Sequence, residues 1–126
     1  MRYRNVLLVD DDIDDQEIFL MALETVSPAV SCTIAGSGHE ALKKLNEQQV
    51  QPDVIFMDLN MPLMRGEQVL KELKQHQHLQ QIPVIVFSTS SNPVTIQQTK
   101  NLGADDFITK PNSFNELTRM LEELFT

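Results

Sequence analysis

The stretch Asp-Val-Ile-Phe-Met-Asp-Leu-Asn-Met-Pro, residues 53–62, contains a short apolar run that ends in an aspartate. Four apolar residues, Val54–Met57, precede Asp58, and a loop-like segment with Pro62 follows it. A run that is apolar on both faces is typical of a parallel strand covered by helices on each side, whereas a strand with one face in water alternates. The stretch therefore predicts a buried central strand with a carboxylate at its carboxyl end.

On both sides of this stretch, strand-like runs alternate with helix-like segments. The expected strands are Asn5–Asp10, Val30–Ala35, Asp53–Asp58, Pro83–Ser88 and Asp106–Thr109. Helical spacing of apolar residues separates them, as in Ile18, Met21 and Ala22 of the first helix. Repeats and linkers between domains are absent from the sequence. This order predicts an α/β fold with a doubly wound, five-stranded parallel sheet, in a single domain over residues 1–126 without an effector domain.

Several expected helix ends carry capping residues. Ser37 and Ser113 each precede a glutamate by three residues, which is the form of a capping box. Asn92 before Pro93 suits an N-cap followed by the first helical position. Gly103 is expected to end the fourth helix. The local signals thus agree with the alternation of strands and helices.

Composition excludes several classes of function. The net charge of −8 argues against binding to nucleic acid, which depends on Lys and Arg to neutralise phosphates. The apolar runs are too short to span a membrane, and the N-terminus lacks the apolar core of a signal peptide, so we expect a cytoplasmic protein. Cys32 is the single cysteine, which rules out an internal disulfide and suits an inert thiol in the core.

Polar residues lie at the carboxyl ends of four of the five expected strands. They are Asp10-Asp11-Asp12 at the end of the first, Asp58 at the end of the third, Ser88-Thr89 at the end of the fourth, and Lys110-Pro111 at the end of the fifth. In a doubly wound parallel sheet the carboxyl ends of the strands meet at one edge, where ligands bind. These side chains are therefore expected to form one site.

The residue types indicate phosphoryl chemistry. Clustered carboxylates repel one another unless they hold protons or a hard cation, and Mg²⁺ is the cation that also binds phosphate oxygens. Lys110 supplies a positive charge that can pair with a carboxylate or a phosphate, and Ser88 supplies a hydroxyl donor. Asp58 is the candidate nucleophile, since a carboxylate can accept a phosphoryl group as an acyl phosphate.

Taken together, these segments resemble the bacterial two-component response-regulator receiver family, from about Val6 to Leu124. The motifs that carry the resemblance are Val9-Asp10-Asp11, Asp58-Leu59-Asn60-Met61-Pro62 with Gly66, Ile82-Pro83-Val84 with Ser88-Thr89, and Gly103-Ala104-Asp105 with Lys110-Pro111. The chain looks like the stand-alone, chemotaxis-regulator-like members. The Asp58–Pro62 run with Ser88-Thr89-Ser90 is also similar to receivers found beside phytochrome-type kinases. The resemblance implies a flavodoxin-like (βα)5 fold with strand order 2-1-3-4-5.

The resemblance also implies a role for each site residue. Asp58 would be the phosphoacceptor, Asp10 and Asp11 would bind Mg²⁺ or Mn²⁺ together with Asp58, and Asn60 would add a backbone carbonyl to the metal. Lys110 would contact the phosphate, with a cis bond before Pro111. Ser88 would be the hydroxyl switch residue, and Phe107 the aromatic ring that responds to it.

The implied function is a signalling switch rather than a metabolic enzyme. A sensor histidine kinase or a histidine phosphotransfer protein would phosphorylate Asp58. An unidentified downstream protein would then bind the surface of helix four, strand five and helix five, with the chain as a monomer or a phosphorylation-linked homodimer. No partner in a membrane or among nucleic acids is expected.

The sequence departs from the family pattern at two positions. Phe107 lacks the hydroxyl of the tyrosine found in many relatives, and Arg65 stands where an acidic residue is frequent. The run Asp10-Asp11-Asp12 leaves open which two of its carboxylates bind metal, although the strand end at Val9 favours Asp10 and Asp11.

Two alternative functions stay open. One is a receiver-like binding module without phosphorylation. A phosphatase of the haloacid-dehalogenase kind is the other, but it needs a second acid where this chain has Asn60.

Overall fold

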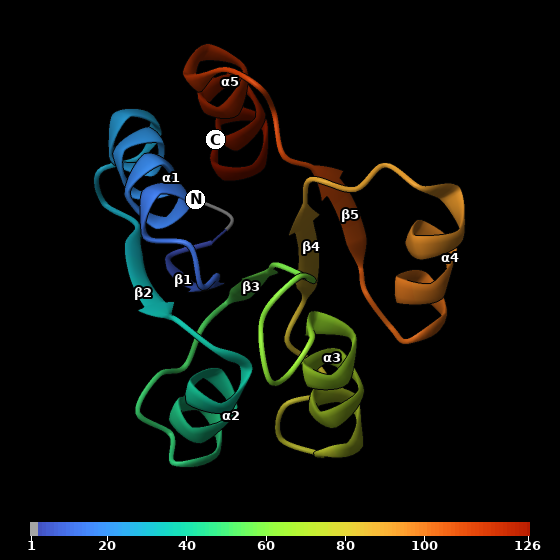
Figure 1. Ribbon diagram of the computed structural model, residues 1–126. Coiled ribbons are helices and arrows are strands. Elements are labelled where there is room, and N and C mark those ends of the chain that lie inside the picture. Colours follow the sequence, from blue (N-terminus) through green and yellow to red (C-terminus); the bar gives the residue numbers. More distant parts are fainter. Residues whose placement is uncertain (1–2) are drawn as a thin grey trace.

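The computed structural model describes residues 3–126 as five strands alternating with five helices (Figure 1). The strands are β1 (Asn5–Val9), β2 (Ser31–Ala35), β3 (Val54–Met57), β4 (Val84–Ser88) and β5 (Asp106–Thr109). The helices are α1 (Ile13–Val26), α2 (Gly38–Asn46), α3 (Gly66–Gln75), α4 (Pro93–Asn101) and α5 (Phe114–Phe125). Each predicted strand agrees with the structure to within one residue at either end.

All the strand pairs are parallel, and the sheet order is β2-β1-β3-β4-β5. This confirms the predicted doubly wound, flavodoxin-like fold. The chain moves outward from β1 to β2 and then crosses back to β3, so the strand order reverses between β1 and β3 (Figure 1). In doubly wound folds, such a reversal of strand order at the carboxyl edge of the sheet is where ligands bind.

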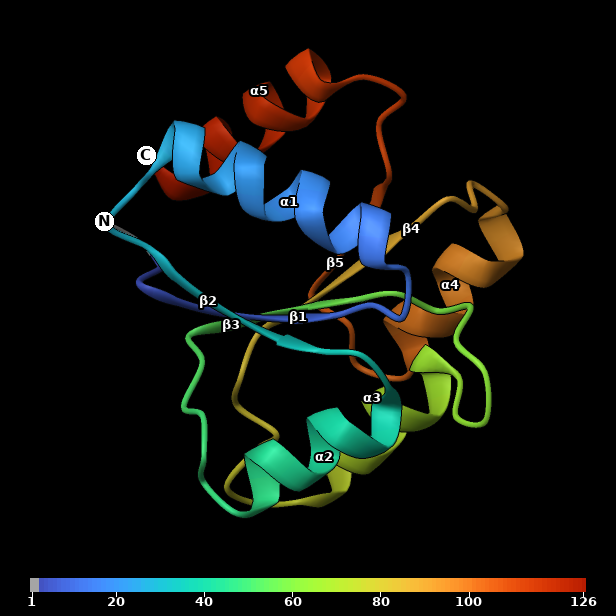
Figure 2. The ribbon, with the colours of Figure 1, turned by 60° about the vertical axis from the view of Figure 1, so that its left-hand side comes forward.

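Helices cover both faces of the sheet. Figure 2 shows α1 and α5 on one face and α2 and α3 on the other, with α4 toward the β5 edge. Along β3, Ile55 and Met57 belong to the core beneath α2 and α3, while Val54 and Phe56 belong to the core beneath α1 and α5. Both faces of β3 are thus buried, which explains why its sequence is continuously apolar.

The predicted apolar stripe of α1 is partly wrong. Ala22 is buried as expected, but Ile18 is 44% exposed and Met21 is 60% exposed. Phe19 and Leu23 are buried in their place. Both sets have helical spacing, because α1 carries apolar residues on more than one side. Periodicity therefore could not decide which side faces the sheet.

The helix ends follow the local signals. The hydroxyls of Ser37 and Ser113 each accept a hydrogen bond from the backbone amide three residues later. The Asn92 side chain accepts from the amide of Val94, and Gly103 adopts a φ of +108° after α4. No helix within residues 3–126 is long and apolar enough to cross a membrane.

Leu63, in the loop between β3 and α3, has an unfavourable backbone conformation. Its φ is +68° and the residue is 94% exposed, so side-chain burial does not offset the strain. A non-glycine residue in the left-handed region costs about 1–2 kcal/mol, while glycine loses about 0.5–1 kcal/mol of chain entropy on folding. Leu63→Gly is expected to raise the free energy of unfolding by about 0.5–1 kcal/mol, measured by urea denaturation. Leu63→Ala keeps the Cβ atom and should give no such gain; equal stability of the two variants would contradict the prediction.

Candidate functional site

The carboxyl ends of four strands meet at one edge of the sheet, as the sequence predicts. Asp10 follows β1, Asp58 follows β3, Ser88 ends β4 and Lys110 follows β5. Asp10, Asp58 and Ser88 are all buried, with relative exposures of 1%, 9% and 0%. Polar groups buried in this way require partners, and those partners are found within the site itself.

Three carboxylates form a compact cluster. Oxygen atoms of Asp10, Asp11 and Asp58 all lie within 4.8 Å of one another. Burial is the main cause that raises the pKa of Asp10, since the charged form loses contact with water. Asp11 is exposed, so the cluster opens to solvent on one side. An all-oxygen donor set with an open side fits a hard divalent cation such as Mg²⁺ or Mn²⁺.

Asp12, the third aspartate of the run, has a structural role. Its side chain accepts hydrogen bonds from the amides of Asp14 at 2.9 Å and Asp15 at 3.2 Å, which makes it the N-cap of α1. The amide of Asp12 itself donates to Asp10 Oδ1 at 3.0 Å. This geometry agrees with the assignment of Asp10 and Asp11, not Asp12, to the acidic cluster.

Lys110 is the cation of the site. Its Nζ atom lies 2.9 Å from Asp10 Oδ2, 2.9 Å from Asp15 Oδ2 and 3.4 Å from Asp58 Oδ2. Burial opposes the charge on the ammonium group, but the hydrogen bonds to Asp10 and Asp15 outweigh it and raise the pKa of Lys110. Lys110 is therefore positively charged at neutral pH and offsets part of the repulsion among the carboxylates.

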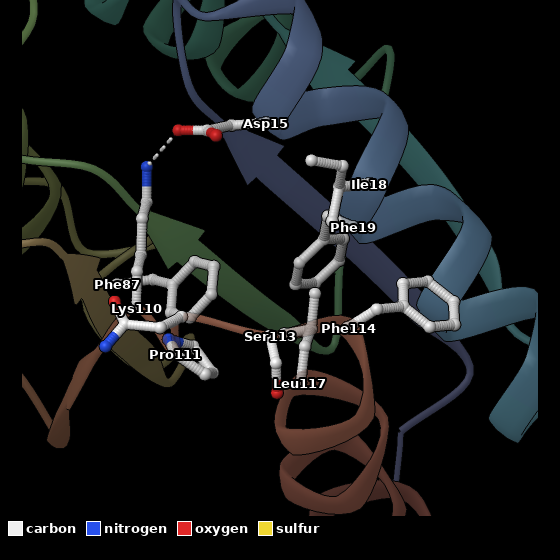
Figure 3. Close-up of a pocket in the computed structure, with 10 residues that line it drawn as sticks. Asp15, Ile18, Phe19, Phe87, Lys110, Pro111, Ser113, Phe114 and Leu117 are labelled. Atoms are coloured by element: carbon white, nitrogen blue, oxygen red, sulfur yellow. Dashed lines mark hydrogen bonds and ion pairs between the residues drawn. The ribbon is translucent and has the colours of Figure 1, made fainter.

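Asp15 is a member of the site that the sequence did not reveal. It projects from the first turn of α1 toward Lys110, as Figure 3 shows, at the rim of a cleft between α1 and the segment that joins β5 to α5. An acidic residue in the first turn of a helix is already explained by the helix dipole. The sequence therefore contains no signal that distinguishes Asp15 from its neighbour Asp14.

The loop after β3 holds the Asp58 carboxylate in place. Asp58 Oδ1 accepts a hydrogen bond of 2.8 Å from the amide of Leu59, and the amide of Gly66 donates to the Leu59 carbonyl at 3.0 Å. Asn60 is exposed, and its side-chain oxygen accepts from Arg65 Nη2 at 3.3 Å. Arg65 thus forms hydrogen bonds with both Asn60 and Glu67, where the loop leads into α3.

Ser88 and Phe107 occupy different surroundings. The Ser88 hydroxyl is buried and accepts a hydrogen bond of 3.3 Å from the amide of Ser90, while the Ser88 carbonyl accepts from the amide of Lys110 at 2.7 Å. Phe107 is half-buried and lines a cleft between α4 and β5 with Ile96. Phe107 therefore lies outside the carboxylate cluster.

The prediction of a cis bond between Lys110 and Pro111 is wrong. This bond is trans, as is every peptide bond in the described part of the chain. The trans isomer is the more stable form for most X–Pro bonds, by about 0.5–1 kcal/mol. With the bond in trans, Lys110 Nζ still reaches all three of its carboxylate partners.

The cysteine lies away from this site. Cys32 is on β2, partly buried against the core beneath α1 and α5. Burial raises the pKa of its thiol to about 12, which suppresses the reactive thiolate. This agrees with the prediction of an inert thiol.

Comparison with known proteins decides the family. The sequence model of the response regulator receiver domain matches residues 6–122, nearly the whole chain. The chain belongs to the response regulator receiver family. Receiver domains of this family act as switches in two-component signalling.

Among curated receiver proteins, the chain is 30% identical over 122 residues to response regulator Rcp1 from Synechocystis, which covers 93% of this chain and 83% of Rcp1. It is 33% identical over 118 residues to the probable C4-dicarboxylate response regulator DctR from Bacillus subtilis, but it spans only 50% of that protein. It spans 31% of a protein-glutamate methylesterase from Syntrophomonas wolfei at 38% identity. The shared part in these longer relatives is thus the receiver.

Solved receiver structures agree closely with the fold. The phosphorylated cyanobacterial phytochrome response regulator RcpA superimposes with a TM-score of 0.88 at 29% identity, over 97% of this chain and 91% of RcpA. The Mn²⁺-bound form of response regulator Rcp1 gives a TM-score of 0.85 at 29% identity, over 96% and 91%. Similarity to phytochrome response regulators thus extends from sequence to structure.

Proposed function

We propose that this receiver is a phosphorylation-dependent response regulator that accepts a phosphoryl group on Asp58. The donor would be a sensor histidine kinase or a histidine phosphotransfer protein. The observation that carries the proposal is the setting of the Asp58 carboxylate, which has one oxygen held by the Leu59 amide at 2.8 Å and the other beside Lys110 at 3.4 Å. It lies at the carboxyl edge of the sheet, in a cluster with two further carboxylates.

The transfer step needs little from the protein beyond position and charge. An Asp58 oxygen attacks the phosphorus atom, the phosphorus–nitrogen bond to the donor histidine breaks, and its electron pair stays on the imidazole, which takes a proton from solvent. Lys110 pairs with one phosphoryl oxygen, and the Ser88 hydroxyl donates to another. Hydrolysis of the resulting acyl phosphate by water returns Asp58 to its free form. The chain is thus a switch and not a metabolic enzyme.

Mg²⁺ or Mn²⁺ would be held by Asp10, Asp11 and Asp58, with the Asn60 backbone carbonyl as a further ligand. The bound cation neutralises charge on the carboxylates and on the phosphoryl oxygens. Without it, the three clustered carboxylates have only Lys110 to offset their repulsion, among the contacts of residues 3–126.

Divalent cations are therefore expected to stabilise the folded protein. At a Mg²⁺ concentration about ten times its Kd, binding adds about 1.4 kcal/mol to the free energy of unfolding. For a domain of this size the Tm should rise by roughly 3–6 °C, as measured by differential scanning calorimetry. Asp11→Asn, which removes the exposed ligand, should show a smaller rise at the same concentration. A wild-type Tm that does not change with Mg²⁺ would contradict the metal assignment.

The test of the proposed function is phosphorylation by a small-molecule donor. Incubation with acetyl phosphate and Mg²⁺, followed by intact-mass measurement, should add the mass of one phosphoryl group. Omission of Mg²⁺ should reduce the adduct strongly. If wild-type protein gives no adduct under conditions where the Mg²⁺-dependent rise in Tm is observed, the chain is a receiver-like binding module instead.

The output would be a change of surface at α4, β5 and α5. A phosphoryl group beside Ser88 would draw its hydroxyl inward, the loop of residues 89–92 would follow, and Phe107 would move in its cleft. The loop is already linked to β5, because the Thr109 hydroxyl donates to the Ser90 carbonyl at 3.2 Å. A downstream protein in the cytoplasm, or a second copy of the chain, would bind the altered surface. Gel filtration with and without beryllium fluoride distinguishes the monomer from a phosphorylation-linked homodimer.

A further inference from the structure

The Lys110 ammonium contacts three carboxylates, although its proposed role at the phosphorylation site requires only the contact with Asp58. Its ammonium nitrogen is 2.9 Å from both Asp10 and Asp15, but 3.4 Å from Asp58. The Asp10 and Asp58 side chains are nearly buried, at 2% and 11% exposure, whereas the Asp15 side chain is 40% exposed. Asp15 is thus the most exposed of these three carboxylates, and it approaches the lysine from α1 (Figure 3).

The position of this ammonium affects the two ligands of the site in opposite ways. A positive charge close to Asp58 attracts a phosphoryl anion there and repels a divalent cation at the adjacent acidic cluster. A carboxylate that pairs with the ammonium reduces both effects. The negative charge of the carboxylate itself also attracts a divalent cation and repels a phosphoryl anion. Asp15 has this position, because it contacts Lys110 without being part of the carboxylate cluster.

We propose that Asp15 is a positioning residue that holds the Lys110 ammonium partly away from Asp58, so that the resting site favours the divalent cation and disfavours the phosphoryl anion. The proposal rests on the proposed function, since it concerns the ligands of the phosphorylation site. Asp15 acts through Lys110 and makes no contact with the reacting atoms. It sets how readily the lysine turns from the carboxylates to an incoming phosphoryl group.

The test compares the affinity of Asp15→Asn and wild type for a cation and for an anion. The chain has no tryptophan, so Mn²⁺ binding is followed by electron paramagnetic resonance instead of intrinsic fluorescence. Beryllium fluoride binding at saturating Mg²⁺ is followed by ¹⁹F NMR titration. In Asp15→Asn, the Kd for Mn²⁺ is expected to rise about two- to fivefold and the Kd for beryllium fluoride to fall about two- to fivefold, the range for a partly exposed ion pair.

Opposite changes distinguish this role from a structural one. If Asp15 only stabilised the fold, its loss would weaken both ligands together and lower the Tm. Asp14→Asn is the matched control, because Asp14 lies on the same first turn of α1. Its substitution removes the same charge, and the same kind of interaction with the helix dipole, as Asp15→Asn. Asp14→Asn should leave both Kd values within about 1.5-fold of wild type. Asp15→Glu, which keeps the charge, should restore at least part of each shift.

Three results would overturn the proposal: unchanged Kd values in Asp15→Asn, a parallel loss of both affinities, or equal shifts in Asp14→Asn. Failure of the proposed function has a different signature, because wild type itself would then not bind beryllium fluoride. In that case the Mn²⁺ titration still tests the link between Asp15 and Lys110. An unchanged Kd for Mn²⁺ in Asp15→Asn would then refute it.

Discussion

Asp58→Asn is expected to abolish the phosphoryl adduct that wild-type protein forms with acetyl phosphate and Mg²⁺. The asparagine side chain has almost the same size, so it can still accept the hydrogen bond from the Leu59 amide. Its neutral amide oxygen, however, is not a carboxylate nucleophile and cannot form an acyl phosphate. The expected result is complete loss of the adduct by intact-mass measurement in a protein with an unchanged circular dichroism spectrum.

Asp12→Asn is the control for this prediction. Asp12 belongs to the neighbouring acidic run, but its side chain caps α1, and asparagine is an equally good N-cap. This variant should form the adduct to the same extent as wild type. An undiminished adduct in Asp58→Asn would refute the assignment of Asp58, and a lost adduct in Asp12→Asn would place a site residue where the structure has a helix cap.

Gly66→Ala is expected to lower the stability of the fold and to disturb the site at the same time. A Cβ atom at this position would lie 2.3 Å from the Asp58 carbonyl oxygen and 2.9 Å from Leu59 Cα. Both neighbours are backbone atoms, so relief requires the loop after β3 to move. Overpacking of this kind costs about 1–3 kcal/mol, and we expect the upper part of that range in urea denaturation. Because the loop carries Asp58, phosphorylation by acetyl phosphate should also become slower.

Gly36→Ala is the matched control. A Cβ atom at residue 36 would meet two side-chain atoms, Glu40 Oε2 at 3.5 Å and Gln16 Nε2 at 4.0 Å, and both distances are ordinary contacts. The free energy of unfolding should then change by no more than about 0.5 kcal/mol. Equal stability of Gly66→Ala and Gly36→Ala would show that the loop after β3 accommodates a side chain, and that the close approach at Gly66 does not constrain Asp58.

The sequence predicted the architecture because that architecture depends on local patterns. The continuous apolar run of β3 indicated a strand buried on both faces, and the structure divides its residues between two cores. Asn92 marked a helix start through its capping side chain, and Gly103 marked a helix end through its positive φ. The strand ends also predicted which polar residues would gather, since parallel strands bring their carboxyl ends to one edge.

Contacts between distant segments depended on the tertiary structure. Asp15 and Lys110 are 95 residues apart, and an acidic first turn is expected of any helix, so their ion pair had no sequence signal. The face that α1 buries was also decided by packing. Gly66 is a further case, because only the folded loop brings it against the Asp58 carbonyl. The sequence by itself thus determined the elements, their order and the residues at the strand ends. The tertiary structure decided which side chains share Lys110 and how closely the loop encloses Asp58, since these depend on the relative positions of segments that local preferences do not specify.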